Sequence, residues 1–147
     1  MDELDARLLR ELDAAPRVGV LELSRRLGVA RGTVQARLDR LVERGVIAGF
    51  APTLDPVALG YTVTAFATLE IRQGRGQVVL EHLRDIPEVL EVHTITGAGD
   101  MLCRLVARSN ADLQRVLDRV TEYPEIVRTS TVIALSNPIP HRVLPLV

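Results

Sequence analysis

The segment from Val20 to Arg44 constrains this chain more than any other. Two short patterns of apolar residues at helical spacing flank a corner at Gly28, and glycine favours the left-handed conformation that ends a helix. Between Ser24 and Arg44 six arginines stand against two acidic residues, a local net charge of +4. This layout predicts a helix-turn-helix, a motif whose second helix enters the major groove of DNA.

The rest of the composition is that of a globular protein. Its 147 residues are 47% hydrophobic and 25% charged, which suits one ordinary domain or two small ones. The net charge is only −1, and residues 51–147 hold nine arginines against eleven acids. A local basic patch of this size binds DNA weakly, so we expect the protein to act as a dimer or a larger assembly.

Several classes of protein are disfavoured. No run reaches the roughly 18 apolar residues of a membrane span, and the acidic, amphipathic start is unlike a signal peptide, so a cytoplasmic protein is expected. The single cysteine, Cys103, excludes an internal disulfide. The three histidines and this cysteine show no metal-ligand spacing, so neither a metal nor another cofactor is expected.

The N-terminal third is predicted to form three helices. Leucines at helical spacing follow Asp2 and Asp5, either of which can cap the first helix, and Pro16 ends it. The second helix ends at Gly28 and the third at Gly45. Together they predict a DNA-binding domain over residues 1–50. Its last residues, 46–50, have an alternating apolar character and predict a short strand, either a wing or the start of a linker.

Polar side chains off the apolar stripe of the third helix are the candidate DNA contacts. Arg31 and Gln35 lie one turn apart near its N-terminus, where arginine can fork onto guanine and glutamine onto adenine. Thr33 and Arg37 suit phosphates better. For any single residue, a solvated arginine-rich surface remains the alternative. The predicted DNA-binding residues are Arg25, Arg26, Arg31, Thr33, Gln35, Arg37 and Arg40.

Beyond a proline-containing linker over residues 51–61, the pattern changes to strands and helices. Strands are predicted over residues 62–71, 89–96, 101–108 and 127–135, and helices over residues 77–84 and after Ser109. Ser109 and Asp112 have the spacing of a capping box. The order β-α-β-β-α-β predicts a ferredoxin-like domain over residues 62–147. The predicted fold class is therefore α+β, a winged helix-turn-helix domain followed by this ferredoxin-like domain.

The strands of this second domain are apolar on both faces. Leu102 and Val106 alternate with Met101, Cys103 and Leu105, whereas two helices can cover only one face of a four-stranded sheet. A second copy related by a two-fold axis is the simplest cover for the other face. The pattern therefore predicts a homodimer.

The turn from Thr96 to Asp100 is a candidate ligand site. Its two glycines expose backbone amides, and Asp100 supplies a carboxylate. Amides could bind the carboxylate of an amino acid while Asp100 binds its ammonium group. An ordinary hairpin turn uses the same residue types, so the residues alone leave both interpretations open.

The motif Val34-x2-Arg37-Leu38-x2-Leu41, continued by Gly45-Val46-Ile47-x-Gly49-Phe50, resembles the Lrp/AsnC family of transcriptional regulators. The resemblance continues through Asp55-x3-Leu59-Gly60 and spans nearly the whole chain. One departure is Ala30, where the family usually has a serine; losing that cap would cost about 1 kcal/mol and puts the phosphate contact there in doubt.

What the resemblance implies is more specific than what the residues show. It implies a regulator of transcription that responds to an amino acid, with sheet-mediated dimers that assemble into tetramers or octamers. It places the Gly-x-x-Asp turn and a Thr-x-Thr element in the effector pocket between dimers. By this resemblance the effector-binding residues are Thr96, Gly97, Gly99, Asp100, Thr129 and Thr131.

The leading hypothesis is a sequence-specific, effector-modulated DNA-binding regulator and not an enzyme. One alternative is an architectural protein that binds DNA without sensing a ligand. Another is a haem-pathway decarboxylase, since some enzymes of that pathway resemble the family. Such an enzyme needs histidine and arginine around a tetrapyrrole, whereas His93 is the only histidine in the predicted strands and aromatic residues make up 3% of the chain.

Overall fold

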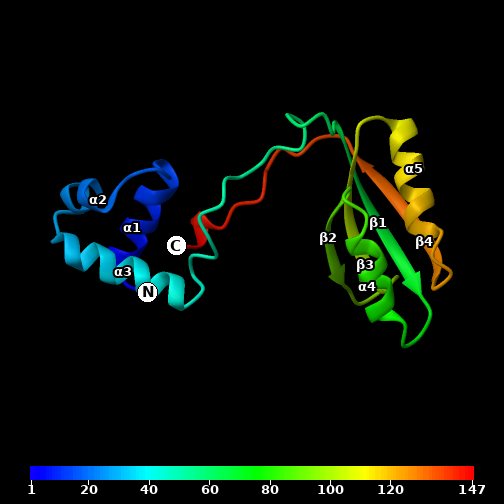
Figure 1. Cartoon of the computed structure of the whole chain (residues 1–147), viewed down its shortest axis with the longest axis horizontal. Helices are drawn as coiled ribbons and strands as arrows, with labels where there is room; N and C mark the ends of the chain where they lie inside the picture. Colours follow the sequence, from blue (N-terminus) through cyan, green and yellow to red (C-terminus); the bar gives the residue numbers. More distant parts are fainter. The chain divides into compact units, whose positions relative to one another are not determined.

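The structure, a computed structural model, describes all 147 residues as two compact units (Figure 1). The N-terminal unit comprises Met1–Thr53 together with Ile139–Val147, and the C-terminal unit comprises Leu54–Pro138. The boundary at residues 53 and 54 falls inside the predicted linker. The last nine residues group with the N-terminal unit, which differs from the predicted domain over residues 62–147. None of the helices is long and apolar enough to cross a membrane.

Three helices form the N-terminal unit: α1 (Glu3–Ala14), α2 (Val20–Leu27) and α3 (Arg31–Glu43). Each helix is too short to bury an apolar stripe by itself, and together they enclose one core. The side chains at its centre are almost inaccessible to solvent and come from all three helices: Leu8, Leu23, Leu27, Val34 and Leu41. The predicted three-helix arrangement is thus confirmed.

The helix ends follow from local chemistry. Asp2 caps α1 reciprocally, because its carboxylate accepts the Asp5 N–H at 3.0 Å and the Asp5 carboxylate accepts the Asp2 N–H at 3.1 Å. Gly28 ends α2 with φ of +70°, a conformation that costs other residues energy. Ala30 precedes α3 in extended conformation and supplies no side-chain cap.

The strand predicted over residues 46–50 does not form. The backbone N–H groups of Val46 and Ile47 both donate to the carbonyl of Leu41, at 2.9 and 3.1 Å, and so close the C-terminal end of α3. No neighbouring strand lies beside this segment. The strand prediction for residues 46–50 was therefore wrong, because the amides of Val46 and Ile47 bind the last turn of α3 and not a neighbouring strand.

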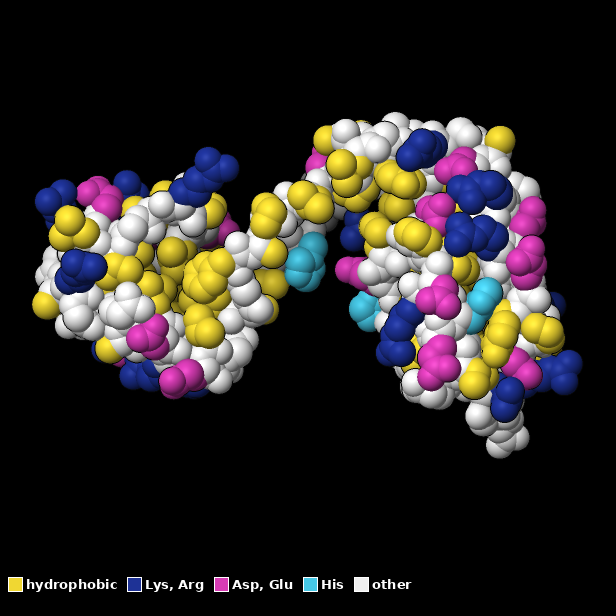
Figure 2. Space-filling view, in the orientation of Figure 1, with side chains coloured by type: hydrophobic (Ala, Val, Ile, Leu, Met, Phe, Trp, Pro, Cys, Tyr) yellow, Lys and Arg dark blue, Asp and Glu magenta, His cyan; other side chains and the backbone are white.

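The C-terminal segment of the chain packs against α1. A short 3-10 turn, η1 (Leu144–Leu146), lies beside that helix, and the Arg10 guanidinium donates to the Val147 carbonyl at 3.0 Å. Apolar side chains of this segment line a surface groove with Leu9 and Leu12. Figure 2 shows hydrophobic side chains gathered at the surface of this unit. Apolar contact explains why the segment belongs to the N-terminal unit.

The C-terminal unit is the predicted ferredoxin-like fold. Its elements, in chain order, are β1 (Val63–Ile71), α4 (Gly76–Arg84), β2 (Val89–Thr94), β3 (Met101–Ala107), α5 (Asn110–Thr121) and β4 (Ile126–Ala134). The strands pair antiparallel in the order β2-β3-β1-β4, and α4 and α5 lie on one face (Figure 1). Ser109 caps α5, since its hydroxyl accepts the Asp112 N–H at 3.1 Å.

The two faces of the sheet differ in their cover. Ala65, Ala67 and Leu69 of β1 point to the helices and are fully buried. Side chains of opposite parity form the open face, defined here as Thr64, Phe66, Thr68, Leu102, Arg104, Ser130 and Val132. Phe66 is 36% exposed and Val132 63% exposed on this face. Nothing within the chain's own sheet and helices covers these apolar groups.

Candidate nucleic-acid interface and effector site

Helix α3 buries one stripe and exposes the residues that the sequence proposed for DNA contact. Val34 and Leu41 lie in the core of the unit, which turns Arg31, Thr33 and Gln35 to solvent. Arg31 is the first residue of α3 and forms no ion pair. The helix therefore presents a cationic side chain and two neutral hydrogen-bonding side chains in its N-terminal half.

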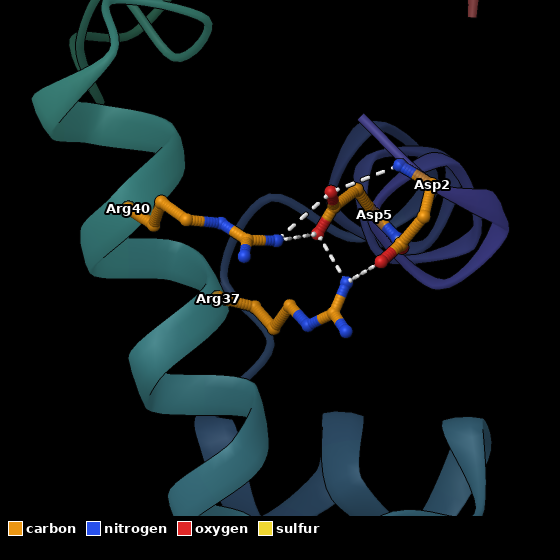
Figure 3. A network of polar contacts seen from close by, with 4 residues as sticks. All are labelled: Asp2, Asp5, Arg37 and Arg40. Atoms are coloured by element: carbon orange, nitrogen blue, oxygen red, sulfur yellow. Dashed lines mark hydrogen bonds and ion pairs between the residues drawn. The ribbon is translucent and has the colours of Figure 1, made fainter.

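A buried carboxylate holds α3 against α1 (Figure 3). Asp5 is 1% exposed, and its carboxylate accepts the Arg37 guanidinium at 2.9 Å and the Arg40 guanidinium at 3.1 Å on both oxygens. Arg37 also donates to Asp2. Since α3 packs chiefly against α2, these ion pairs provide the polar link between α1 and α3.

The electrostatics of this network keep both acids ionised. Burial alone would raise the pKa of Asp5, but the hydrogen bonds from Arg37 and from the Asp2 backbone outweigh it and lower that pKa. The hydrogen bond from Arg37 lowers the pKa of Asp2 to about 2. At neutral pH the buried carboxylate is charged, and both of its oxygens accept hydrogen bonds from arginines of α3.

Contacts within the domain divide the seven predicted DNA-binding residues into those that have a protein partner and those that have none. Arg37 is only 23% exposed and, with Arg40, has a structural partner in Asp5. On α2, Arg26 pairs with Glu22 and Glu11, each at 3.2 Å, and Arg25 pairs with Glu22 at 3.7 Å. The Gln35 amide donates to Asp39 at 2.8 Å. Contact of all seven with DNA stays a prediction. No local pattern in the sequence indicates that Asp5 binds two of them.

The loop between β2 and β3 is fixed to the end of β1. The Ile95 N–H donates to the Asp100 carbonyl at 3.0 Å and closes the loop, while the Asp100 N–H donates to the Leu69 carbonyl at 2.8 Å. Gly99 lies so close to β1 that a Cβ there would stand 2.3 Å from the Thr68 methyl carbon. The exposed loop tip holds Thr96 and Gly97.

Asp100 has a structural contact that sequence reasoning missed. One oxygen of its carboxylate accepts the Ile71 N–H at 2.8 Å, at the point where the β1–β4 register shifts. The β1–β3 register ends at the pair Leu69 and Met101, so Ile71 lies beyond this ladder and its N–H is bound by the side chain of Asp100. The second carboxylate oxygen has no protein partner, so it remains available to a ligand.

The two threonines lie across β1 from this loop. Thr129 pairs with Leu69 and Thr131 with Ala67 in the β1–β4 register. The Thr129 hydroxyl is buried and forms no hydrogen bond, the one such side-chain atom in the structure. A buried hydroxyl without a partner is uncommon. The Asp100 N–H donates to the Leu69 carbonyl, and Thr129 pairs with Leu69 on the other side of β1. Asp100 and Thr129 therefore lie at the same end of the sheet.

Comparisons with known proteins agree with the two-domain fold. Residues 1–48 match the winged helix-turn-helix DNA-binding family, and residues 64–144 match the Lrp/AsnC ligand binding domain. The transcriptional regulator FL11 of Pyrococcus horikoshii is 31% identical over 93% of this chain and 91% of its own. The structure of E. coli AsnC superposes with a TM-score of 0.91 at 29% identity, covering 99% of both chains.

A further solved structure carries a ligand. The feast or famine regulatory protein Rv3291c from M. tuberculosis, complexed with L-methionine, is 28% identical with a TM-score of 0.84 over 97% of both chains. A DNA-binding domain joined to a ligand-binding domain defines an effector-modulated transcriptional regulator. This chain belongs to the Lrp/AsnC family.

Removing the buried carboxylate should destabilise the N-terminal unit. Asp5→Ala removes the charge-assisted hydrogen bonds from Arg37 and Arg40, and because both guanidinium groups stay partly exposed to solvent, the expected cost is about 1.5–3 kcal/mol. Thermal denaturation followed by circular dichroism should show an earlier transition for the helical unit. Asp13→Ala removes an exposed acid from the same helix and should leave the transition within a degree or two. Equal behaviour of the two variants would contradict a structural role for Asp5.

Proposed function

We propose that this regulator binds operator DNA through α3 of two subunits. We further propose that it responds to an amino acid bound beside the β2–β3 loop, at one end of the four-stranded sheet. The exposed, unpaired Arg31 at the start of α3 is the observation that supports the DNA contact most directly. Two α3 helices of a dimer would enter successive major grooves about 34–36 Å apart.

The DNA contact combines base readout with phosphate contact. Arg31 can fork onto guanine and Gln35 can pair with adenine, while Thr33 can reach a phosphate. Arg25, Arg26, Arg37 and Arg40 add positive charge near the DNA, and each also has an acidic partner within the domain. In this proposal the paired arginines orient the helix and raise general affinity, and the unpaired side chains select sequence.

The effector is proposed to be an amino acid. The free oxygen of Asp100 suits an ammonium group, and loop amides near Gly97 and Gly99 suit a carboxylate. The unpaired Thr129 hydroxyl and Thr131 add polar contacts at the same end of the sheet. The L-methionine complex of the related M. tuberculosis regulator supports this class of ligand.

Assembly is proposed to begin with a homodimer through the open face. Phe66 and Val132 expose apolar surface there, and a second copy related by a two-fold axis would bury both. Further association into tetramers or octamers would place the β2–β3 loops between dimers. An effector can then shift DNA binding only if it binds one assembly better than another.

The alternatives make different predictions. An architectural DNA-binding protein would show the same DNA affinity and particle mass at every amino-acid concentration. A haem-pathway decarboxylase would act on a tetrapyrrole substrate, whereas the curated relatives are named as transcriptional regulators. Titration of amino acids during DNA-binding and mass measurements separates the first alternative from the regulator.

Arg31→Ala is expected to weaken binding to the selected operator. Loss of a forked base contact costs about 1–3 kcal/mol, or about 5- to 150-fold in affinity. Fluorescence anisotropy on the operator and on unrelated duplex DNA separates specific from general loss. Arg17→Ala removes an equal charge from an exposed position outside α3. If both variants weaken both duplexes equally, Arg31 does not read a base.

Asp100→Asn is expected to abolish the effector response and preserve the fold. The asparagine oxygen can still accept the Ile71 N–H, but the charge that attracts an ammonium group is gone. Asp100→Ala should also lose a little stability, because it removes an exposed hydrogen bond whose net contribution is about 0.5–1.5 kcal/mol. A thermal-shift screen with the twenty amino acids identifies the stabilising effector. An unchanged shift in Asp100→Asn would exclude this carboxylate from the site.

Phe66→Asp is expected to break the dimer. The substitution places a charge in the centre of the open face, where a partner sheet would have to desolvate it. Light scattering after size-exclusion chromatography should report a smaller particle mass than for the wild-type protein. Leu90→Asp is the matched control, because Leu90 is similarly exposed but lines a groove beside α4. Full-size particles in Phe66→Asp would show that the contact lies elsewhere.

A further inference from the structure

We infer that Asp39 is a positioning residue that fixes the side-chain amide of Gln35 for reading one base. This inference rests on the proposed placement of α3 in the major groove. Arg31, Gln35 and Asp39 follow one another at four-residue intervals and lie exposed along one row of the helix. The Gln35 Nε2 group donates to the Asp39 carboxylate at 2.8 Å.

The hydrogen bond sets the orientation of the amide. A glutamine side chain can present its oxygen or its nitrogen on a given side, and only its partners decide which. Because an ionised carboxylate accepts and cannot donate, Asp39 draws the amide nitrogen toward itself. The Gln35 oxygen is then held on the opposite side, and the second N–H of the amide remains free.

A fixed amide presents one pattern of donor and acceptor. Adenine offers an N6 donor beside an N7 acceptor in the major groove, which is the complement of an oxygen beside an N–H. A glutamine free to flip could also satisfy other arrangements of donors and acceptors. Asp39 therefore narrows the choice of base at the position that Gln35 reads, and adenine is the base that fits.

The charge of Asp39 favours this role over a role in affinity. Asp39 forms no ion pair with any arginine, although Arg37 and Arg40 flank it in the sequence. A carboxylate on the exposed side of a DNA-reading helix repels phosphates and lowers affinity for every sequence. Its one polar partner in the structure is the side chain that is proposed to contact a base.

Glutamine–aspartate pairs four residues apart modestly stabilise any helix, so they are not confined to α3. The Gln114 amide of α5 also donates to Asp118, at 2.8 Å. This second pair lies in the C-terminal unit and supplies a matched control. Asp118→Ala removes an equivalent hydrogen bond and charge from a helix outside the helix-turn-helix.

The test measures base preference with the full-length protein. An operator is first selected by the wild-type protein from duplex DNA with a randomised core. Relative affinities are then measured on all single-base substitutions of that operator. Gln35→Ala identifies the position that Gln35 reads. At this position Asp39→Ala is expected to reduce the preference for adenine at least about threefold, out of the roughly 5- to 150-fold that a paired contact supplies.

Three further variants separate positioning from charge and stability. Asp39→Glu keeps a carboxylate that can only accept, four residues from Gln35, and is expected to retain most of the preference. Glu43→Gln removes a different exposed acid from α3 and should raise affinity for all duplexes without changing the preference. Asp118→Ala should change neither. In a Gln35→Ala background, Asp39→Ala should have no further effect on base preference.

The outcomes distinguish this inference from the function on which it rests. If Gln35→Ala leaves every base preference intact, the proposed contact of Gln35 fails and the role of Asp39 fails with it. If Gln35→Ala erases one preference while Asp39→Ala retains it in full, Asp39 does not position the amide. If Asp39→Ala alters all positions alike, as Glu43→Gln does, its effect is one of charge alone.

Discussion

The buried carboxylate of Asp5 is the interaction on which the DNA-reading geometry depends. It lies at the first turn of α1, accepts two arginines of α3 and completes the cap of its own helix. A charge this deeply buried is tolerated only because every oxygen has a charged or backbone donor. The contact that holds α3 in the domain also gives Arg37 and Arg40 a partner within the protein.

A similar dual use of polar groups occurs in the sensing unit. Asp100 binds the Ile71 amide, which lies beyond the end of the β1–β3 ladder, and its second oxygen has no protein partner. Gly99 permits the close approach of the loop to Thr68. The β2–β3 loop is thus positioned by β1, the strand that also pairs with Thr129.

Much of the architecture was predictable because it is local. Apolar spacing located the helices and strands to within two residues, and Asp2, Gly28 and Ser109 marked helix ends by chemistry that acts over a few residues. The short strand expected at residues 46–50 was wrong for a non-local reason. The amides of Val46 and Ile47 donate to the carbonyl of Leu41, and the apolar pattern of the segment does not indicate which acceptor its amides bind.

Periodicity and residue type were enough to predict the two-domain plan, the polar row of α3 and the Gly-x-x-Asp turn. Which charges are free depends on how the chain packs. The tertiary structure paired Arg37 with Asp5, 32 positions away, joined Asp100 to Ile71 across 29, and left Arg31 without a partner. Partners at such separations are set by packing of the core, which brings distant side chains together without any local signature.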